Sequence, residues 1–146
     1  MNEVTENLPQ MKIQLEKMML LYQAALEEVL TRINILNREF KIANSYSPIE
    51  HISSRIKTPK SIFKKMQKNN IEISAENMIR YIDDIAGIRI VCKFTSDIYL
   101  LVELIEKQQD LKILIHKDYI KNQKPSGYQS YHLIVSVPVN LAEGCI

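Results

Sequence analysis

Apolar residues recur every three or four positions over residues 11–44, a segment that contains neither glycine nor proline. This is the period of an amphipathic α-helix, so the pattern predicts one long helix, or two helices separated by a break. The near-heptad spacing would suit a partner helix, whereas packing against the chain's own domain would use the same apolar stripe. Both interpretations are open at the level of sequence.

Two shorter helices are predicted after this segment. The residue before Pro48 is disfavoured in the helical region of backbone space, so the long helix ends there. Thr58 can cap a helix over residues 58–68, with Pro59 at its first position, and Asn69-Asn70 ends this helix. A serine can cap a third helical segment over residues 74–81.

Strand patterns dominate the second half of the chain. Alternating or Ile- and Leu-rich segments lie at residues 88–94, 112–120 and 130–137. Between the first two, Ser96 and Asp97 can cap an amphipathic helix that carries Ile98, Leu101, Val102 and Ile105 on one side. A strand, a helix and a strand in this order predict a crossover unit with parallel strands. We therefore expect an α+β fold in which a mixed β-sheet is flanked by helices.

The composition narrows the range of functions. A chain of 146 residues that is 46% hydrophobic can form one domain with a real core. Its net charge of +2 is too small to attract polyanions over the whole surface, so phosphate binding would need local clustering. Two distant cysteines and three glycines leave neither a CxxC metal pair nor a glycine-rich nucleotide loop. Because no secretory signal or membrane span is recognisable, we expect a cytoplasmic protein with no membrane partner.

Such a cluster occurs in the predicted second helix. Between residues 55 and 68 there is no acid, and the basic residues are Arg55, Lys57, Lys60, Lys64, Lys65 and Lys68. The lysines recur at spacings of three and four, opposite an apolar face, so the pattern predicts a helix with a buried side and a cationic side. Lysines four residues apart repel one another, and cations at a helix N-terminus oppose its dipole, so a bound polyphosphate would relieve both penalties. The alternative is a lysine-rich face that is merely solvated.

Asp83 and Asp84 stand just before the strand that contains Arg89. A carboxylate held at the edge of a strand could bind Mg²⁺, which usually takes one or two protein carboxylates and leaves its other positions to phosphates and water. On spacing alone, the simpler interpretation is that both aspartates terminate the preceding helix.

The segment KPSGYQSYH, residues 124–132, presents Tyr128 on a turn beside Lys124. An aromatic side chain on a loop beside cations can stack on a base while the cations bind its phosphates. His132 lies on the strand that follows, and a lone histidine is more often a structural hydrogen-bonding group than a catalyst.

Together these segments resemble the synthetase domain of the RelA/SpoT family, in particular the small single-domain alarmone synthetases. The resemblance runs from about residue 22 to the C-terminus. Five motifs in the family's order carry it: Ser47-Pro48-Ile49-Glu50-His51-Ile52; the Arg-x-Lys-x-x-x-Ser-x-x-x-Lys pattern of Arg55, Lys57, Ser61 and Lys65; Asp84-Ile85-Ala86-Gly87-Ile88-Arg89; Lys117-Asp118-Tyr119-Ile120; and Lys124-Pro125-Ser126-Gly127-Tyr128-Gln129-Ser130-Tyr131-His132. It implies a nucleotidyltransferase-like fold, with an N-terminal helical region at residues 1–44 and a synthetase domain at residues 45–146.

The resemblance also implies an activity, that of a GTP pyrophosphokinase (ATP:GTP 3′-diphosphotransferase). Such enzymes transfer the β,γ-pyrophosphate of ATP to the 3′-hydroxyl of GDP or GTP and make the alarmone (p)ppGpp. The implied ATP-binding residues are Arg55, Lys57, Ser61, Lys65 and Arg89, with the two arginines sandwiching adenine. Asp84 would be the catalytic residue that holds Mg²⁺. The implied GTP- or GDP-binding residues are Lys117, Lys124, Tyr128 and His132, with the tyrosine stacked on guanine.

One departure from the family concerns the C-terminus. In the family a later strand carries Glu-Ile-Gln-Ile-Arg-Thr, whose glutamate is the second metal-site carboxylate and the candidate base. This chain ends before that motif, and Glu143 does not stand in it. The helices that support a homotetramer in relatives would also follow. We therefore expect a C-terminally incomplete synthetase domain. Because relatives form a homotetramer, the resemblance also implies a homo-oligomer.

Two other functions are consistent with the sequence. A catalytically inactive nucleotide- or RNA-binding module would use the same lysine helix and tyrosine loop. A helical oligomerisation protein would be built on residues 11–44.

Overall fold

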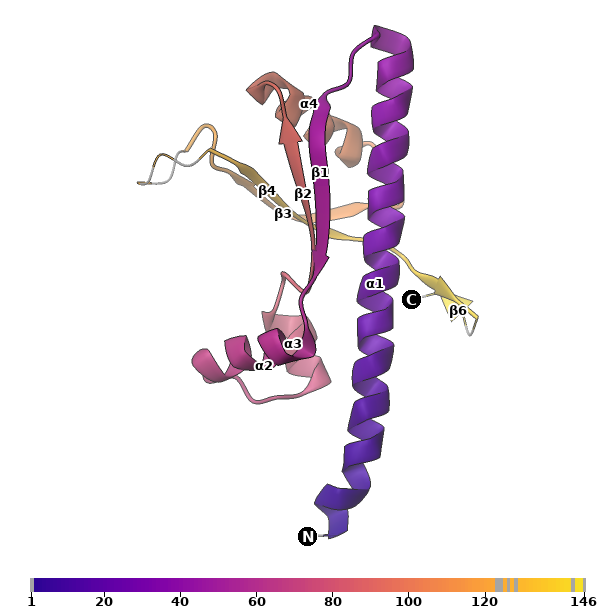
Figure 1. Ribbon diagram of the computed structural model, residues 1–146, viewed down its shortest axis with the longest axis vertical. Helices are drawn as coiled ribbons and strands as arrows, with labels where there is room; N and C mark the ends of the chain where they lie inside the picture. The colour runs from indigo at the N-terminus through magenta and orange to yellow at the C-terminus, as the bar shows by residue number, and fades with distance from the viewer. Residues whose placement is uncertain (1, 123–124, 126, 128, 143, 146) are drawn as a thin grey trace. The chain divides into compact units, whose positions relative to one another are not determined.

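The computed structural model describes residues 2–122, 125, 127, 129–142 and 144–145. Within this part of the chain there are four helices and six strands (Figure 1). Contacts divide the chain into two compact units, one with residues up to 27 and 54–87 (unit 1) and one with residues 28–53 and from 88 onward (unit 2). The α+β class predicted from the sequence is confirmed.

The long N-terminal segment is one continuous helix, α1 (Asn2–Asn44) (Figure 1). The prediction of a helix over residues 11–44 is thus confirmed, and the alternative of two helices with a break is wrong. The helix ends at Ser45, which has a left-handed backbone (φ 56°) and donates its N–H to the Lys41 carbonyl at 2.8 Å. This cap satisfies one of the free carbonyls of the last turn.

Unit 1 contains α2 (Pro59–Lys68) and α3 (Ala75–Tyr81), which pack together with the N-terminal part of α1. Its buried core consists of Met18, Ile62, Met66, Met78, Ile82 and Ile85. The predicted caps are confirmed, because the side chain of Thr58 accepts the N–H of Ser61 at 3.2 Å and the side chain of Ser74 accepts that of Asn77 at 3.1 Å.

The end of α2 follows an asparagine signal that was visible in the sequence. Asn70 has a left-handed backbone (φ 56°), its N–H bonds to the Gln67 carbonyl, and the N–H of Ile71 bonds to the Met66 carbonyl at 2.8 Å. These two bonds form a Schellman motif, which ends the helix and turns the chain.

Strand β1 (Ile49–Ile56) was not predicted. Its apolar residues stand at positions 49, 52 and 56, a spacing of three and four without the alternation of a half-buried strand. It pairs with β2 (Ala86–Cys92), and Figure 1 shows the two strands side by side in opposite directions. The hydrogen bonds to β2, rather than its own side-chain pattern, make this segment a strand.

In unit 2, β3 (Lys112–Asp118) pairs antiparallel with β4 (Tyr131–Ser136), with a register shift between Ile113 and Ile115. A short hairpin of β5 (Asn140–Leu141) and β6 (Gly144–Cys145) follows. The predicted parallel crossover is wrong for β3, because β3 takes β4 as its partner and β2 takes β1 in the described part of the chain. A β-strand, helix, β-strand order permits a parallel pair but does not require one.

Helix α4 (Thr95–Glu106) begins ahead of both expected caps. Its N-cap is Phe94, and Asp97 caps from the third helical position by accepting the Phe94 N–H at 3.3 Å. Asp97 is a buried residue with 5% of its surface exposed. Its carboxylate also accepts a hydrogen bond from the hydroxyl group of Tyr46. The expectation that Ser96 or Asp97 is the N-cap itself is therefore corrected.

None of the helices in the described residues combines the length and the apolar character that a membrane span requires.

Candidate functional site

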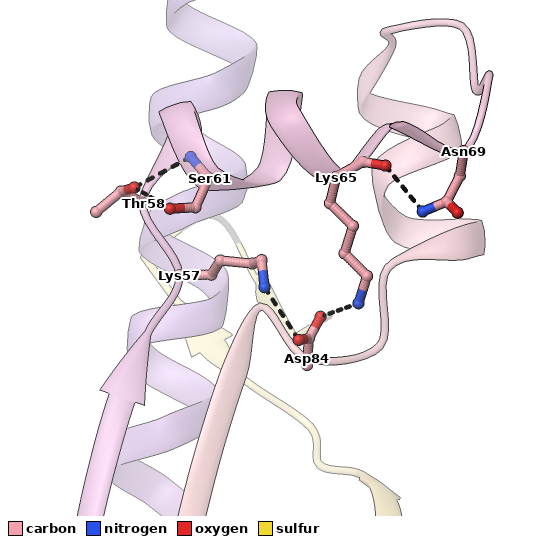
Figure 2. A network of polar contacts seen from close by, with 6 residues as sticks. All are labelled: Lys57, Thr58, Ser61, Lys65, Asn69 and Asp84. Carbon is pink, nitrogen blue, oxygen red and sulfur yellow. Dashed lines mark hydrogen bonds and ion pairs between the residues drawn. The ribbon is translucent and has the colours of Figure 1, made fainter. Parts of the chain in front are cut away.

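Two lysines and one aspartate meet in unit 1, as Figure 2 shows. Lys57 lies between β1 and α2, Lys65 lies on α2, and Asp84 lies in the turn between α3 and β2. The Nζ of Lys57 is 3.1 Å from Oδ2 of Asp84, and the Nζ of Lys65 is 2.9 Å from Oδ1. Each carboxylate oxygen therefore accepts from a different lysine, and we call this arrangement the Asp84 clasp.

The backbone around the clasp is anchored to the core of unit 1. The N–H of Lys57 donates to the carbonyl of Ile85 at 2.7 Å, which ties the segment after β1 to the turn before β2. Ile85 is fully buried, so the residue next to Asp84 is fixed by packing. The side chain of Lys57 is 16% exposed, whereas those of Lys65 and Asp84 are 40% and 47% exposed. The clasp thus has a fixed base and two side chains open to solvent.

The lysines hold Asp84 in its ionised form. Partial burial raises the pKa of the Asp84 carboxyl, but hydrogen bonds and positive charge from Lys65 and Lys57 lower it by more, so the net pKa lies below the ordinary value of 3.8. A carboxyl with a depressed pKa stabilises the fold above the pKa of the unfolded chain, and this contribution is lost as the pH falls through the folded-state pKa. At neutral pH the clasp is an ion pair of one anion with two cations.

The interpretation of Asp83 and Asp84 as helix terminators is wrong. Helix α3 ends at Tyr81, and its C-cap is Ile82, whose N–H bonds to the carbonyl of Met78. Both aspartates lie beyond the cap. Asp84 is therefore available for a role other than terminating α3.

Ser61 lies in the first turn of α2, where Thr58 holds it in two ways. The Oγ of Thr58 accepts the backbone N–H of Ser61, and it also lies 3.0 Å from the Ser61 hydroxyl, to which it donates (Figure 2). Since the hydroxyl of Ser61 receives this hydrogen, its own hydrogen is free to point elsewhere. The sequence pattern indicated Thr58 only as a cap, and its second contact was missed.

A shallow groove of about 450 Å³, wide open to solvent, lies on the exposed face of α2. It is lined by Lys57, Ser61, Lys64, Lys65, Lys68 and Asn69. None of these side chains is acidic, and on the opposite face of the helix Ile62 and Met66 are fully buried. The predicted division of α2 into a buried side and a cationic side is confirmed.

The two arginines expected at adenine are both exposed. Arg55 lies on β1 in unit 1, and Arg89 lies on β2 in unit 2. Their pairing around a base stays a prediction.

Two of the four expected guanine-nucleotide residues come together in unit 2. Lys117 on β3 and His132 on β4 are paired residues in the antiparallel register, and both are exposed. Residues directly opposite each other in such a pair project from the same face of the sheet. The ring of His132 also lies edge-on to Tyr119, with centroids 5.4 Å apart. Lys124 and Tyr128 lie outside the described residues.

Asp118 was quoted in a motif but was given no role from the sequence. Its carboxylate accepts the hydroxyl of Tyr99 at 2.8 Å and the backbone N–H groups of Ile120 and Lys121 at 2.9 and 3.0 Å. Burial raises the pKa of the Asp118 carboxyl, but these hydrogen bonds lower it by more, so the net pKa lies below its ordinary value. An aspartate that accepts from the N–H groups two and three residues further on is a turn signal, and here it shapes the turn that follows β3.

The described residues contain no group of three or more His, Cys, Asp or Glu side chains that could hold a metal ion. Asp84 is thus a single carboxylate beside a cationic groove. This donor set does not fit a metal held by protein alone. It does fit Mg²⁺ that is shared between one carboxylate and the phosphates of a substrate.

Comparison with known proteins identifies the family. Residues 54–144 match the family described as the region found in RelA / SpoT proteins. The chain belongs to the RelA/SpoT family. This RelA/SpoT region begins in β1 and includes the Asp84 clasp, the α2 groove and all of the expected nucleotide-binding residues.

Two curated RelA/SpoT relatives come from Bacillus subtilis (strain 168). The chain is 43% identical to GTP pyrophosphokinase YwaC, over 84% of this chain and 59% of that protein. It is 33% identical to GTP pyrophosphokinase YjbM, over 90% of this chain and 61% of that protein. The chain therefore spans about three fifths of the length of these relatives.

Solved structures of RelA/SpoT proteins confirm the predicted fold class. Small alarmone synthetase 2 from Bacillus subtilis matches with a TM-score of 0.77 and 40% identity, over 90% of this chain and 66% of that chain. Small alarmone synthetase 1 from the same organism, bound to its product pppGpp, matches with a TM-score of 0.79 and 32% identity, over 91% and 68% of the two chains. The predicted resemblance to small alarmone synthetases is confirmed at the level of family and fold.

Proposed function

We propose that this chain is the synthetase part of a cytoplasmic GTP pyrophosphokinase, which transfers the β,γ-pyrophosphate of ATP to the 3′-hydroxyl of GDP or GTP. The observation that carries the proposal is the α2 groove, two of whose lysines bind Asp84, inside a region that belongs to the RelA/SpoT family. Transfer of phosphoryl-type groups depends mainly on positioning and on stabilisation of charge, and this arrangement offers groups of both signs for that purpose.

On the donor side, Lys57, Lys65 and the Ser61 hydroxyl bind the phosphates of ATP. The hydrogen that Thr58 donates to Ser61 leaves the serine's own hydrogen for a phosphate oxygen. We assign Arg55 and Arg89 to the adenine ring on the basis of the family motifs in which they stand. The hydrogen bond from the backbone N–H of Lys57 to the carbonyl of Ile85 holds the backbone of Lys57 in place. This favours a constant position for at least one of the phosphate-binding cations.

Asp84 holds Mg²⁺ together with the substrate phosphates. When bound, this ion neutralises negative charge that accumulates on the transferred group. Because Lys57 and Lys65 of the groove lie beside Asp84, the chain supplies cations for the phosphates and an anion for the metal.

On the acceptor side, Lys117 and His132 face the phosphates of GDP or GTP, together with Lys124. Their shared face on β3 and β4 supports this assignment. Tyr128 stacks on guanine. Small alarmone synthetase 1, whose structure is similar to this one, binds pppGpp as its product, and this supports a guanine nucleotide as the ligand here.

The activity is tested by mixing ATP, GTP and Mg²⁺ with this chain and, in parallel, with a chain extended to the length of its relatives. AMP and guanosine pentaphosphate must form together in equal amounts, as chromatography can measure. If neither chain forms them although both bind nucleotides, the proposal fails, and a nucleotide- or RNA-binding module is the better assignment.

Replacement of Tyr128 by alanine tests the acceptor site. Base stacking on an aromatic side chain contributes about 1–3 kcal/mol, so Tyr128→Ala should weaken GTP or GDP binding by that amount and leave ATP binding nearly unchanged. Calorimetric titration of each nucleotide measures both effects. Tyr81→Ala, at an exposed tyrosine on α3, is the matched control and should change neither affinity. Equal losses for ATP and GTP in Tyr128→Ala would exclude guanine-specific stacking.

We also propose that the chain forms a homo-oligomer through α1. Ile35 and Ile42 lie seven residues apart on this helix and are 45% and 86% exposed, which is the pattern of a helix that packs on a partner. Ile42→Glu should then lower the molar mass measured by sedimentation equilibrium. Glu39→Gln, a substitution at an exposed polar residue of the same helix, is the control. An unchanged mass in Ile42→Glu would remove this part of α1 from the interface.

A further inference from the structure

In the Asp84 clasp, the ion pairs with Asp84 and the proposed binding of phosphates require the same two lysines. Lys57 and Lys65 line the groove that is proposed to bind phosphates, yet in this structure both donate to the carboxylate of Asp84. An anion that enters the groove must therefore compete with an anion that already belongs to the protein.

We infer that Asp84 makes the α2 groove selective for polyphosphates that carry a divalent cation. A metal-free polyphosphate has to take the two lysines from Asp84, and it then leaves a bare carboxylate beside its own negative charge. A polyphosphate that carries Mg²⁺ takes the same lysines, but it brings a cation that the released carboxylate can bind. This inference rests on the proposed function, because it assigns polyphosphate to the groove.

The geometry allows such an exchange of partners without unfolding. Lys65 and Asp84 have side chains that are 40% and 47% exposed, so both can reorient. Lys57 is anchored at its backbone by the bond to Ile85, and only its ammonium group has to change partner. The energetic cost is modest, since an ion pair whose carboxylate is open to solvent contributes little to stability.

The neighbouring charges do not share this role. Lys64 and Lys68 also line the groove, but in the part of the chain that the structure describes they form no ion pair. Within the same described residues Asp83 is exposed and forms no ion pair either. Asp83 therefore carries the same charge one residue away without contacting a lysine, and it provides a matched control.

The test is calorimetric titration with inorganic tripolyphosphate, once with EDTA and once with excess Mg²⁺. In EDTA, Asp84→Asn should bind tripolyphosphate about fivefold more tightly than the natural chain, because the two ion pairs with Lys57 and Lys65 no longer oppose binding. Asp83→Asn should change this affinity by less than about twofold, as expected for an exposed charge that is screened and forms no ion pair with these lysines. Added Mg²⁺ should tighten binding to the natural chain clearly more than binding to Asp84→Asn.

A variant that lacks both lysines separates the effect of the Asp84 clasp on binding from a general effect of negative charge. In Lys57→Met/Lys65→Met, adding Asp84→Asn should tighten binding no more than adding Asp83→Asn does. A larger gain in that background would show that the lysines are not involved and would overturn the inference.

Two further outcomes distinguish this inference from the proposed function. If metal-free tripolyphosphate binds Asp84→Asn as weakly as or more weakly than the natural chain, Asp84 merely orients the lysines, and the inference fails while the proposed function stands. If tripolyphosphate binds neither protein in either buffer, the groove is not a phosphate site, and the donor side of the proposed function fails as well.

Discussion

Asp84→Asn is expected to reduce the Mg²⁺-dependent formation of AMP and guanosine pentaphosphate by at least about a hundredfold, in a chain extended to the length of its relatives. An amide oxygen is neutral and is a much poorer ligand for Mg²⁺ than a carboxylate. The affinity for ATP should weaken only modestly, because Lys57 and Lys65 are released from the carboxylate and stay available to the phosphates. The loss therefore falls on kcat rather than on KM.

Steady-state kinetics at several Mg²⁺ concentrations measure this split between kcat and KM. The control is Asp83→Asn, which removes the same charge from the neighbouring exposed residue and should leave kcat within about twofold. Unchanged turnover in Asp84→Asn would exclude its role in holding the metal.

The sequence predicted those parts of the fold that depend on neighbouring residues. Thr58 and Pro59 start α2, and Asn70 ends it, through hydrogen bonds that span at most five residues. Such caps are determined by the identity of one or two side chains and can be recognised without any tertiary contact. The buried and cationic sides of α2 follow in the same way from the helical period.

Strand pairing is a different kind of property. Nothing within residues 49–56 indicates a strand, and β1 exists because β2 supplies its partner from about 30 residues further along the chain. The direction of β3 is also a long-range property. Its antiparallel pairing with β4 determines that direction, and the order of strand and helix before β3 does not. Long-range pairing of this kind cannot be read from the pattern of one segment.

The candidate site has features that the sequence predicted and features that depend on long-range packing. The resemblance to a family brought Lys57, Lys65 and Asp84 into one site, and the structure confirms that they are close. Nothing in the sequence indicated that the lysines bind the aspartate, because the pairs are separated by 27 and 19 residues. The clasp depends on the core of unit 1, which holds α2 against the turn before β2.

Ile62→Ala tests this dependence of the site on the core. Ile62 has no exposed surface, lies on the buried side of α2 and packs in the same cluster as Ile85, the residue that follows Asp84. Replacing a fully buried isoleucine by alanine removes apolar contacts and leaves a cavity, which costs about 2–5 kcal/mol. We therefore expect the urea midpoint to fall clearly, and binding of tripolyphosphate to weaken at urea concentrations that do not affect the natural chain.

The matched control is Ile79→Ala on α3, the same substitution at a side chain that is 60% exposed. It should change the free energy of unfolding by less than about 0.5 kcal/mol, as is usual for surface positions. Ile62→Val, which removes a single methylene, should cost about 0.5–1.5 kcal/mol and lie between the two. If Ile62→Ala unfolds no more easily than Ile79→Ala, the cluster around Ile62 is not what holds α2 in place. The position of its lysines beside Asp84 would then need a different physical explanation.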